Sequence, residues 1–202
     1  MAACWSCDAP TGERVVFCGC GAIQAPERGL DHFAVLGVPR RFELDARELE
    51  KRYKELTRKL HPDRFARADA RARRYSLERA TQVNDAYKVL RSPVRRAEYL
   101  LKLEGIDVAD EKEGGKGLDP EFLMEVMAER EALAEARAAG ARAQLDQMGA
   151  KMRARREAAM AKVAQGFARG DRAAVERELK ALRYYDRFLE ELEEHEEAAA
   201  HA

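Results

Sequence analysis

The chain has 202 residues, of which 46% are hydrophobic and 37% charged, with 37 basic side chains against 37 acidic ones. This length suffices for one large domain or two small ones with a true core, and the hydrophobic content excludes a wholly disordered chain. No run approaches about 18 apolar residues, which excludes a transmembrane helix, and we expect no secretory signal because the first residues lack its basic and apolar regions. Abundant Ala, Arg, Glu and Leu beside few Gly and Pro predict an all-α fold.

The neutral total hides an uneven distribution of charge. Residues 1–38 carry a net charge of −2, residues 39–103 carry +9 and residues 104–202 carry −7. Charge distribution is informative about partners rather than about fold. The basic middle of the chain therefore indicates a partner that is either nucleic acid or an acidic protein surface.

All four cysteines lie within the first 20 residues, in a C-x2-C pair and a C-x-C pair separated by ten residues. Thiolates so close in sequence can converge on one tetrahedral ion, and without a secretory signal structural disulfides are not expected. A segment this short needs a metal to fold, so we expect one structural Zn²⁺ site, with iron, a cluster or redox thiols as alternatives. Gly19 and Gly21 are expected to let the backbone tighten around the metal, and residues 15–17 to form a short strand. The predicted ligands are Cys4, Cys7, Cys18 and Cys20.

Helix signals begin after this cysteine-rich segment. A short helix is predicted over 31–36, ended by Gly37. A longer helix is predicted to begin after Asp45, with Glu48 as its capping-box partner, and to run to about residue 60.

The longer helix has two contrasting faces. Apolar residues recur at i, i+4, i+7 and i+11, and cations recur with the same spacing about 200° away at roughly 100° per residue. Like charges four residues apart lower helix stability, so this face indicates a partner outside the chain. The alternative is a solvated basic face whose charge is partly offset by nearby glutamates. The apolar stripe comprises Leu49, Tyr53, Leu56 and Leu60, and the cationic stripe comprises Arg47, Lys51, Lys54 and Arg58.

The next helices are separated by clear breakers. One is predicted over 68–90, followed by a break at Ser92-Pro93 and a helix over 94–103. Residues 105–118 are rich in Gly and charge and indicate a linker between domains. The core-facing residues of the first of these helices are predicted to be Tyr75, Val83, Ala86, Tyr87 and Leu90.

The last part of the chain predicts a bundle. Helices are expected over 119–138, 141–169 and 171–194, and their short connections imply antiparallel neighbours, hence three packed helices. The tail from residue 190 to 202 is expected to fray. Core positions on the first helix of the bundle are predicted to be Phe122, Val126 and Leu133.

The tripeptide His61-Pro62-Asp63 lies between the basic helix and the helix that follows it. By itself it could be a simple helix stop. The segment over 31–103, however, resembles a J-domain, and the chain is similar to the HscB-type iron–sulfur co-chaperones; its cysteine segment resembles the N-terminal extension of animal-type members. The resemblance rests on DHFAVLGVPRRFELD, LHPDRFA, VNDAYKVLRSPVRRAEYLLKLEGI, DPEFLMEVM and LRYYDRF, which follow the family's order over nearly the whole chain.

The resemblance implies a domain plan and a function. The plan is a Cys4 zinc-binding module over 1–28, a J-domain over 29–104, a linker over 105–118, a three-helix scaffold-binding domain over 119–195 and a tail over 196–202. The implied function is that of a cytoplasmic co-chaperone without enzyme activity of its own. It would deliver an IscU-type iron–sulfur scaffold to an HscA/DnaK-type ATPase and stimulate ATP hydrolysis, with no nucleic-acid or membrane partner.

Residue roles carry over by the same resemblance. His61, Pro62 and Asp63 would form the ATPase-stimulating loop, and the cationic stripe would dock on an acidic surface of the ATPase. The family commonly has Glu at the position of Ala128, so one polar contact of the family's patch is not expected in this chain. It also commonly has Leu at the position of Met127 and Phe at that of Tyr184. The scaffold-binding patch would comprise Leu123, Met124, Met127, Arg130, Glu131 and Tyr184.

Three other functions compete with this one. A general J-protein for unfolded clients is disfavoured by the compact C-terminal bundle and by the lack of a Gly/Phe-rich linker. A zinc-dependent nucleic-acid module would require aromatic residues interleaved with the cations, and none stand there. An enzyme is the weakest alternative, because two of the four histidines lie in the acidic tail and no nucleophile–base pair or phosphate loop stands out.

Overall fold

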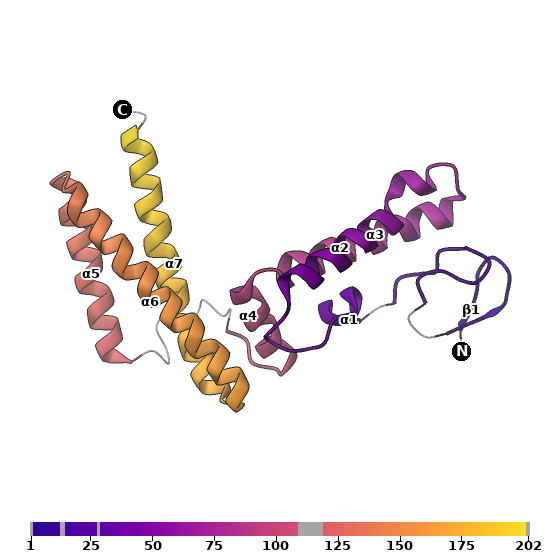
Figure 1. Cartoon of the computed structure of the whole chain (residues 1–202), viewed down its shortest axis with the longest axis horizontal. Helices are drawn as coiled ribbons and strands as arrows, with labels where there is room; N and C mark the ends of the chain where they lie inside the picture. Colours follow the sequence, from indigo (N-terminus) through magenta and orange to yellow (C-terminus); the bar gives the residue numbers. More distant parts are fainter. Residues whose placement is uncertain (1, 13–14, 28, 109–118, 201–202) are drawn as a thin grey trace. The chain divides into compact units, whose positions relative to one another are not determined.

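The computed structural model describes residues 2–12, 15–27, 29–108 and 119–200, with side chains up to residue 194, and is almost wholly helical (Figure 1). It divides into two compact units, Met1–Arg96 and Ala97–Ala202, each with its own buried core. No helix in these ranges is long and apolar enough to cross a membrane. The predicted all-α fold is confirmed.

The N-terminal segment folds as a small module with minimal strand. β1 (Ala2–Ala3) pairs antiparallel with β2 (Pro10–Thr11), and Phe17 forms one isolated bridge with Ile23. The predicted strand over 15–17 is therefore wrong beyond a single residue. The reason is local, because the chain turns back immediately after Phe17. This turn leaves room for the single bridge between Phe17 and Ile23 and not for a continuous strand pairing.

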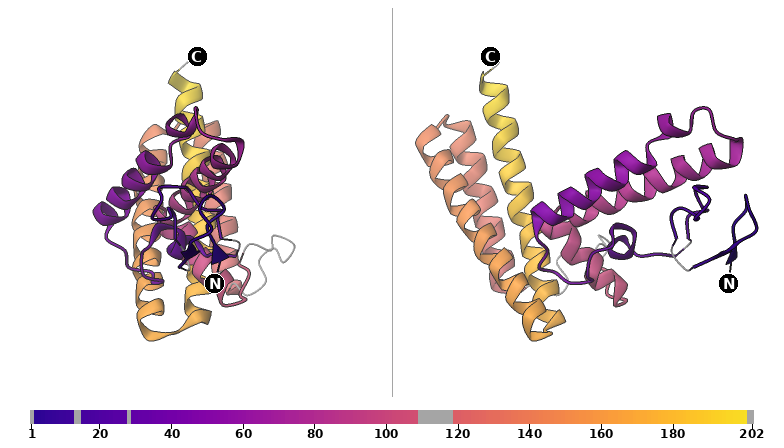
Figure 2. Two further views of the ribbon diagram at one scale, coloured as in Figure 1. Left: turned by 90° about the vertical axis from the view of Figure 1, so that its right-hand side faces the viewer. Right: turned by 45° about the vertical axis from the view of Figure 1, so that its right-hand side comes forward.

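The helices of the first unit are α1 (His32–Leu36), α2 (Ala46–Leu60), α3 (Ala70–Leu90) and the start of α4 (Pro93–Leu103), with a 3₁₀ turn η1 (Pro62–Phe65) between α2 and α3. α2 and α3 lie side by side and antiparallel, with η1 at the end where they are joined (Figure 2). α1 packs on α3. This arrangement places the His61-Pro62-Asp63 tripeptide at the turn between two long helices.

Side-chain caps fix where these helices begin and end. Asp31 Oδ1 accepts from the Ala34 amide at 2.8 Å, and Gly37 ends α1 with φ of 64°. Asp45 caps α2 through the amides of residues 47 and 48, but the Glu48 carboxylate binds Arg52 at 2.9 Å, so the predicted capping box forms in one direction only. An ion pair one turn along competes with the second bond of the box.

The core of the first unit follows the predicted faces closely. Leu49 and Leu60 of α2 are buried, and Tyr53 stacks on Tyr87 of α3 with ring centroids 3.9 Å apart. Leu56 is half-buried. The fully buried apolar side chains of the unit include Phe33, Leu36, Leu60, Val83, Ala86 and Leu90.

The second unit contains the predicted three long helices, α5 (Pro120–Ala138), α6 (Arg142–Arg169) and α7 (Arg172–Ala200) (Figure 1). α7 continues to Ala200, so the expected fraying from residue 190 is wrong. Leu192 is buried and anchors this end, and the residues that follow are Glu and Ala apart from His195; Glu and Ala are strong helix formers. Within α5, Leu133 is buried as predicted, whereas Phe122 and Val126 are only half-buried.

The end of α4 belongs to the second unit and is bound to α7. Arg183 donates to the Glu98 carboxylate at 2.7 and 3.0 Å and to the carbonyl of Val108 at 2.8 Å. Arg172 pairs with Glu104. The division between the units falls within α4, before the predicted linker, and residues 109–118 of that linker lie outside the described residues.

Candidate functional site

The four cysteines converge, as their spacing predicts. Their sulfur atoms all lie within 4.8 Å of one another and form no disulfide. Sγ of Cys4 is 3.8 Å from Sγ of Cys20, and Sγ of Cys7 is 3.7 Å from Sγ of Cys18. A tetrahedral Zn²⁺ with Zn–S bonds of about 2.3 Å requires S···S edges of about 3.8 Å. The cluster therefore has the donor set and spacing to hold one metal ion.

Two tight turns build the cluster. Asp8 has a φ of 57° and its amide donates to the Cys4 carbonyl at 3.0 Å, which folds the first pair. Gly21 has a φ of 86° and its amide donates to the Cys18 carbonyl at 2.8 Å, which folds the second. Gly21 thus supplies the backbone freedom expected of it, while Gly19 keeps an ordinary negative φ.

Cys4 is the buried member of the cluster, with 1% of its surface exposed. Its Sγ accepts from the Ser6 amide at 3.4 Å and from Nε2 of Gln24 at 3.3 Å. Burial raises the pKa of the Cys4 thiol, but these and other hydrogen bonds outweigh burial and lower it to about 6. The Ala9 amide lowers the pKa of Cys7, yet the nearby sulfurs raise it to about 12. Four sulfurs this close cannot all ionise without a cation among them.

The cysteine module also contacts α3. Nε1 of Trp5 donates to the Ile23 carbonyl at 2.6 Å, and its ring meets Tyr75 edge-on with centroids 6.3 Å apart. Tyr75, which was predicted to face the helical core, thus packs against the module instead. Neither Trp5 nor Gln24 carries a sequence signal for this role, because neither belongs to a spaced motif.

The His61-Pro62-Asp63 loop is a short, ordered 3₁₀ turn at the surface. Nδ1 of His61 accepts from the Asp63 amide at 3.3 Å, and the Arg64 amide donates to the His61 carbonyl at 3.0 Å. The same nitrogen lies 3.5 Å from Oδ2 of Asp63, and half of the His61 side chain is exposed. The Asp63 side chain is 89% exposed. The His61 imidazole and the Asp63 carboxylate are therefore both exposed on this turn.

The base of this loop is fixed to α3 by one buried hydroxyl. Oγ of Ser76 donates to the carbonyl of Leu60, the last residue of α2, at 2.7 Å. Pro62 has no N–H, so the end of α2 needs partners from elsewhere. Sequence reasoning missed Ser76, because a serine within an otherwise polar helix surface has no distinguishing spacing.

The cationic stripe of α2 is exposed, as predicted, but its charges are partly offset. Lys54 pairs with Glu50 at 2.7 Å, which lowers the pKa of Glu50 and raises that of Lys54, and Lys51 approaches Glu48 at 3.9 Å. Surface pairs of this kind are weak and exchange readily for a partner's carboxylates. A shallow depression in this face is lined by Arg47, Glu50, Lys51, Lys54, Glu55 and Arg58.

The predicted patch on α5 contains two strongly exposed apolar side chains. Met124 is 66% exposed and Met127 is 71% exposed, whereas Leu123 is half-buried beside them. Arg130 lies 3.5 Å from the Glu191 carboxylate of α7, and Glu131 is exposed. The two methionines, three residues apart on α5, place flexible apolar side chains on this face of the helix.

Tyr184 reaches the same helix from α7. Its ring meets Phe122 edge-on at 6.0 Å, and its hydroxyl donates to the Val126 carbonyl at 3.4 Å. Burial is the main cause that raises its pKa to about 12. Tyr184 is therefore packed against α5 within the bundle and presents only part of its ring.

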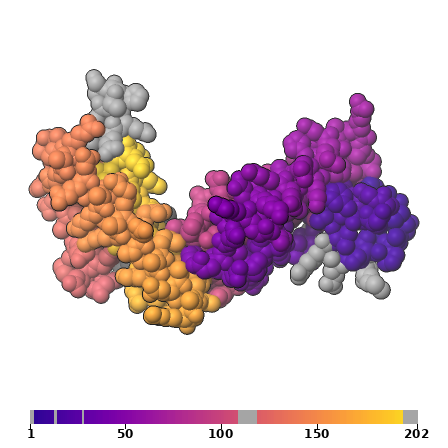
Figure 3. Space-filling view, viewed as in Figure 1, coloured from indigo at the N-terminus to yellow at the C-terminus, as the bar shows by residue number. Residues whose placement is uncertain are grey.

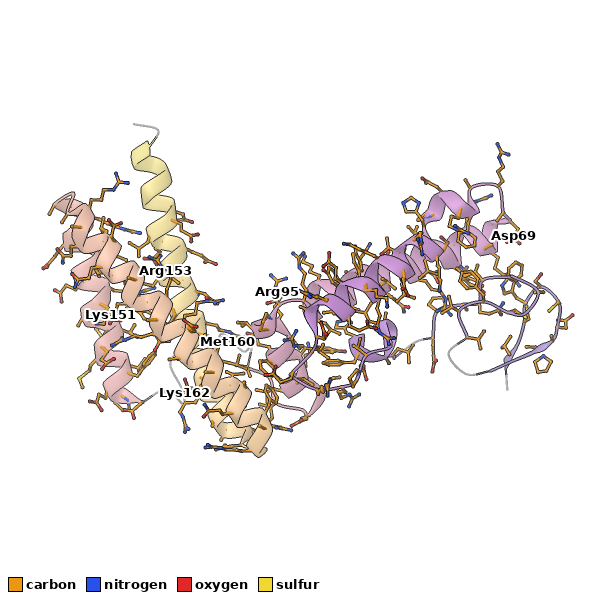
Figure 4. All side chains as sticks on the ribbon, in the orientation of Figure 1. Asp69, Arg95, Lys151, Arg153, Met160 and Lys162 are labelled. Carbon is orange, nitrogen blue, oxygen red and sulfur yellow. The ribbon has the colours of Figure 1, made fainter. Side chains whose placement is uncertain are left out.

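α5 is held to α6 by ion pairs around one carboxylate. Glu129 accepts from Arg155 at 2.7 Å and from Lys151, labelled in Figure 4, at 3.1 Å. Its side chain is 12% exposed, so these pairs are shielded from water. They secure α5 on its inner side and leave the methionine face open.

Comparison with known proteins identifies both helical parts. Residues 31–99 match the DnaJ domain and residues 118–193 match the HSCB C-terminal oligomerisation domain. The chain is 33% identical to the iron–sulfur cluster co-chaperone protein HscB of Homo sapiens, over 94% of this chain and 80% of that one. It is 38% identical to the co-chaperone protein HscB homolog of Azoarcus sp. (strain BH72), over 83% and 94%.

The fold agrees with this. The crystal structure of human co-chaperone protein HscB superposes with a TM-score of 0.86 at 32% identity, covering 95% of this chain and 97% of that one. Motifs, element order and fold all lead to one family. The chain belongs to the HscB family of iron–sulfur cluster co-chaperones.

Proposed function

We propose that this protein delivers an IscU-type scaffold to an HscA/DnaK-type ATPase, whose ATP hydrolysis it stimulates through His61, Pro62 and Asp63. The observation that carries the proposal is the ordered, exposed turn of this tripeptide directly after the cationic stripe of α2. A cationic helix face steers an acidic partner and fixes its register, and the loop beside it can then contact the partner. The protein would act without catalytic chemistry of its own.

The decisive experiment measures ATP turnover of the partner chaperone. His61→Gln should abolish stimulation while circular dichroism and thermal unfolding stay unchanged, since the imidazole makes only local contacts. Lys51→Glu with Lys54→Glu should raise the concentration needed for half-maximal stimulation, most strongly at low salt. Lys88→Glu with Lys102→Glu, two exposed lysines outside the stripe, is the matched control for charge. Undiminished stimulation by His61→Gln would sink the proposal.

The scaffold would bind the α5 patch. Its two exposed methionines supply adaptable apolar surface, and Arg130 and Glu131 supply a polar rim. Alanine at Leu123, Met127 and Tyr184 together should abolish binding of an IscU-type scaffold while helicity persists. Leu77→Ala removes an exposed leucine elsewhere and should leave binding intact. Retained binding by the triple variant would overturn this assignment.

For the cysteine cluster we propose a single structural Zn²⁺, held by Cys4, Cys7, Cys18 and Cys20. Zinc favours four thiolates in a closed tetrahedral site, and the sulfur spacing suits it. Metal analysis of protein purified without chelator should find one zinc per chain, and stoichiometric iron would contradict this. We place the protein in the cytoplasm, where thiols of this kind stay reduced.

A further inference from the structure

The cysteine module and α3 are joined by a half-buried arginine. Arg79 of α3 donates through Nε to the Gln24 carbonyl at 2.8 Å and through Nη2 to the carbonyls of Ala25 and Val15 at 2.8 and 3.2 Å. Burial lowers the pKa of this guanidinium, which the nearby Glu27 partly offsets. A desolvated arginine is stable here because three carbonyl oxygens receive its N–H groups.

The same contact leads to the metal ligands through one further residue. The Gln24 carbonyl accepts from Arg79, while Nε2 of Gln24 donates to the Cys4 sulfur at 3.3 Å and to the Ala22 carbonyl at 2.8 Å. Gln24 is 9% exposed, so both bonds are shielded from water. A hydrogen bond to a ligating sulfur orients it and stabilises its negative charge. Arg79 and Gln24 thus connect α3 to the Cys4 sulfur through consecutive hydrogen bonds.

Aromatic contacts complete the junction. The Tyr75 ring of α3 meets Trp5 edge-on, and the Arg71 guanidinium lies 5.4 Å from the centre of the Trp5 ring. Trp5 stands between Cys4 and Cys7 in the first turn of the cluster. In Figure 3 the indigo surface of the module adjoins the magenta surface of α3. The contacts on α3 therefore extend over two turns, from residue 71 to residue 79.

This part of α3 also supports the loop at its other side. Ser76, which lies between Tyr75 and Arg79 in sequence, binds the Leu60 carbonyl at the base of the His61-Pro62-Asp63 turn. The first half of α3 thus shares its residues between the metal module and the loop. Formation of the contacts with the metal module therefore favours formation of the Ser76–Leu60 hydrogen bond, because both depend on the same two turns of α3.

We infer that Arg79 and Gln24 are positioning residues for the metal site, and that through them metal binding and the folding of α3 stabilise each other. The module is too small to fold without its metal, so metal binding orders the carbonyls that Arg79 requires. By thermodynamic reciprocity, a docked α3 must tighten metal binding by the same factor. The inference rests on the proposed zinc site and does not depend on the proposed ATPase partner.

The test uses the full chain and measures zinc affinity by competition with a chromogenic chelator. Arg79→Met and Gln24→Leu should each weaken zinc binding by about 10-fold or more, as loss of such supporting hydrogen bonds does. Arg73→Met is the matched control, since Arg73 lies on the same helix and donates to the Ala68 carbonyl within the J-domain. Zinc affinities of Arg79→Met and Gln24→Leu within twofold of wild type would overturn the inference.

A second measurement needs no substitution. Hydrogen exchange of the wild-type chain with bound zinc and after chelation should show faster exchange of amides 71–79, 60–61 and 63–66 when the metal is removed. Amides near the far end of α3, over 84–90, should change little and serve as the internal control. Equal protection of residues 71–79 in both states would show that the metal does not support α3, even if Arg79→Met failed to fold.

Discussion

Oγ of Ser76, a fully buried side chain, donates a 2.7 Å hydrogen bond to the carbonyl of Leu60, sixteen residues earlier. This bond joins the end of α2 to the middle of the first half of α3. It closes the loop between the two helices at its base and leaves the His61-Pro62-Asp63 turn free to contact a partner.

Ser76→Ala should lower the free energy of unfolding by about 1–3 kcal/mol, because a buried carbonyl loses its hydrogen-bond donor. Urea denaturation followed by circular dichroism measures the change. Thr81→Ala is the matched control, since its hydroxyl donates to the Leu77 carbonyl on the exposed side of the same helix. We expect the control to stay within about 0.5 kcal/mol of wild type. Equal effects at both positions would contradict the role of Ser76.

Two buried glycines of α6 should respond to alanine with opposite signs. A Cβ at Gly166 would lie 2.6 Å from Cγ2 of Val175 in α7, so Gly166→Ala should destabilise the bundle by about 1–3 kcal/mol through overpacking. A Cβ at Gly149 would meet only the mobile guanidinium of Arg153, at 3.2 Å. Gly149→Ala should stabilise by up to about 1 kcal/mol through helix propensity. Thermal unfolding of both variants under one condition checks the signs, and destabilisation by Gly149→Ala would contradict the second.

Metal removal should be visible in the fluorescence of Trp5, the one tryptophan in the sequence. The indole donates to Ile23 and packs on Tyr75 only while the module is folded. Chelation should therefore shift its emission to longer wavelength, and one equivalent of Zn²⁺, but not Mg²⁺, should reverse the shift. Cys4→Ser should give the shifted spectrum without chelator. An unchanged emission after verified removal of the metal would refute metal-dependent folding of the module.

The bundle should lose stability at alkaline pH through Tyr184. Burial raises its pKa to about 12, whereas an unfolded tyrosine has a pKa of about 10. Below pH 10 both states keep the proton; between about pH 10 and 12 the unfolded chain loses a proton that the folded chain retains. The free energy of unfolding should therefore fall across this interval.

Tyr184→Phe tests this directly, because it removes the titrating group and keeps the ring. Thermal midpoints measured from pH 8 to 11.5 should fall less steeply for the variant than for wild type. Some loss should persist, since burial also raises the pKa of Tyr185. Parallel curves for the two proteins would show that Tyr184 does not contribute.

Local signals in the sequence sufficed for most of the secondary structure. Asp45 caps α2 as predicted, and Asp31 and Asp119 cap α1 and α5 in the same way, because an aspartate reaches amides only two or three residues ahead. The convergence of the four cysteines could also be predicted from the sequence, since thiolates two or three residues apart can approach one another in only a few ways. Two of the errors have a local cause: Glu48 pairs with Arg52 instead of completing the capping box, and α7 continues through a tail rich in helix formers.

By itself, the sequence determined most of the helices and their ends, the convergence of the four cysteines and the position of the loop tripeptide. Only the tertiary structure decided which distant groups support them: Ser76 under the loop, Arg79 and Gln24 behind Cys4, and Tyr184 against α5. The physical reason is that periodicity and capping report bonds within one or two turns, whereas these contacts join residues 16 to 64 positions apart. In the sequence, Arg79 and Ser76 cannot be told from surface residues, because the carbonyl groups that they bind are brought to them only when the chain folds.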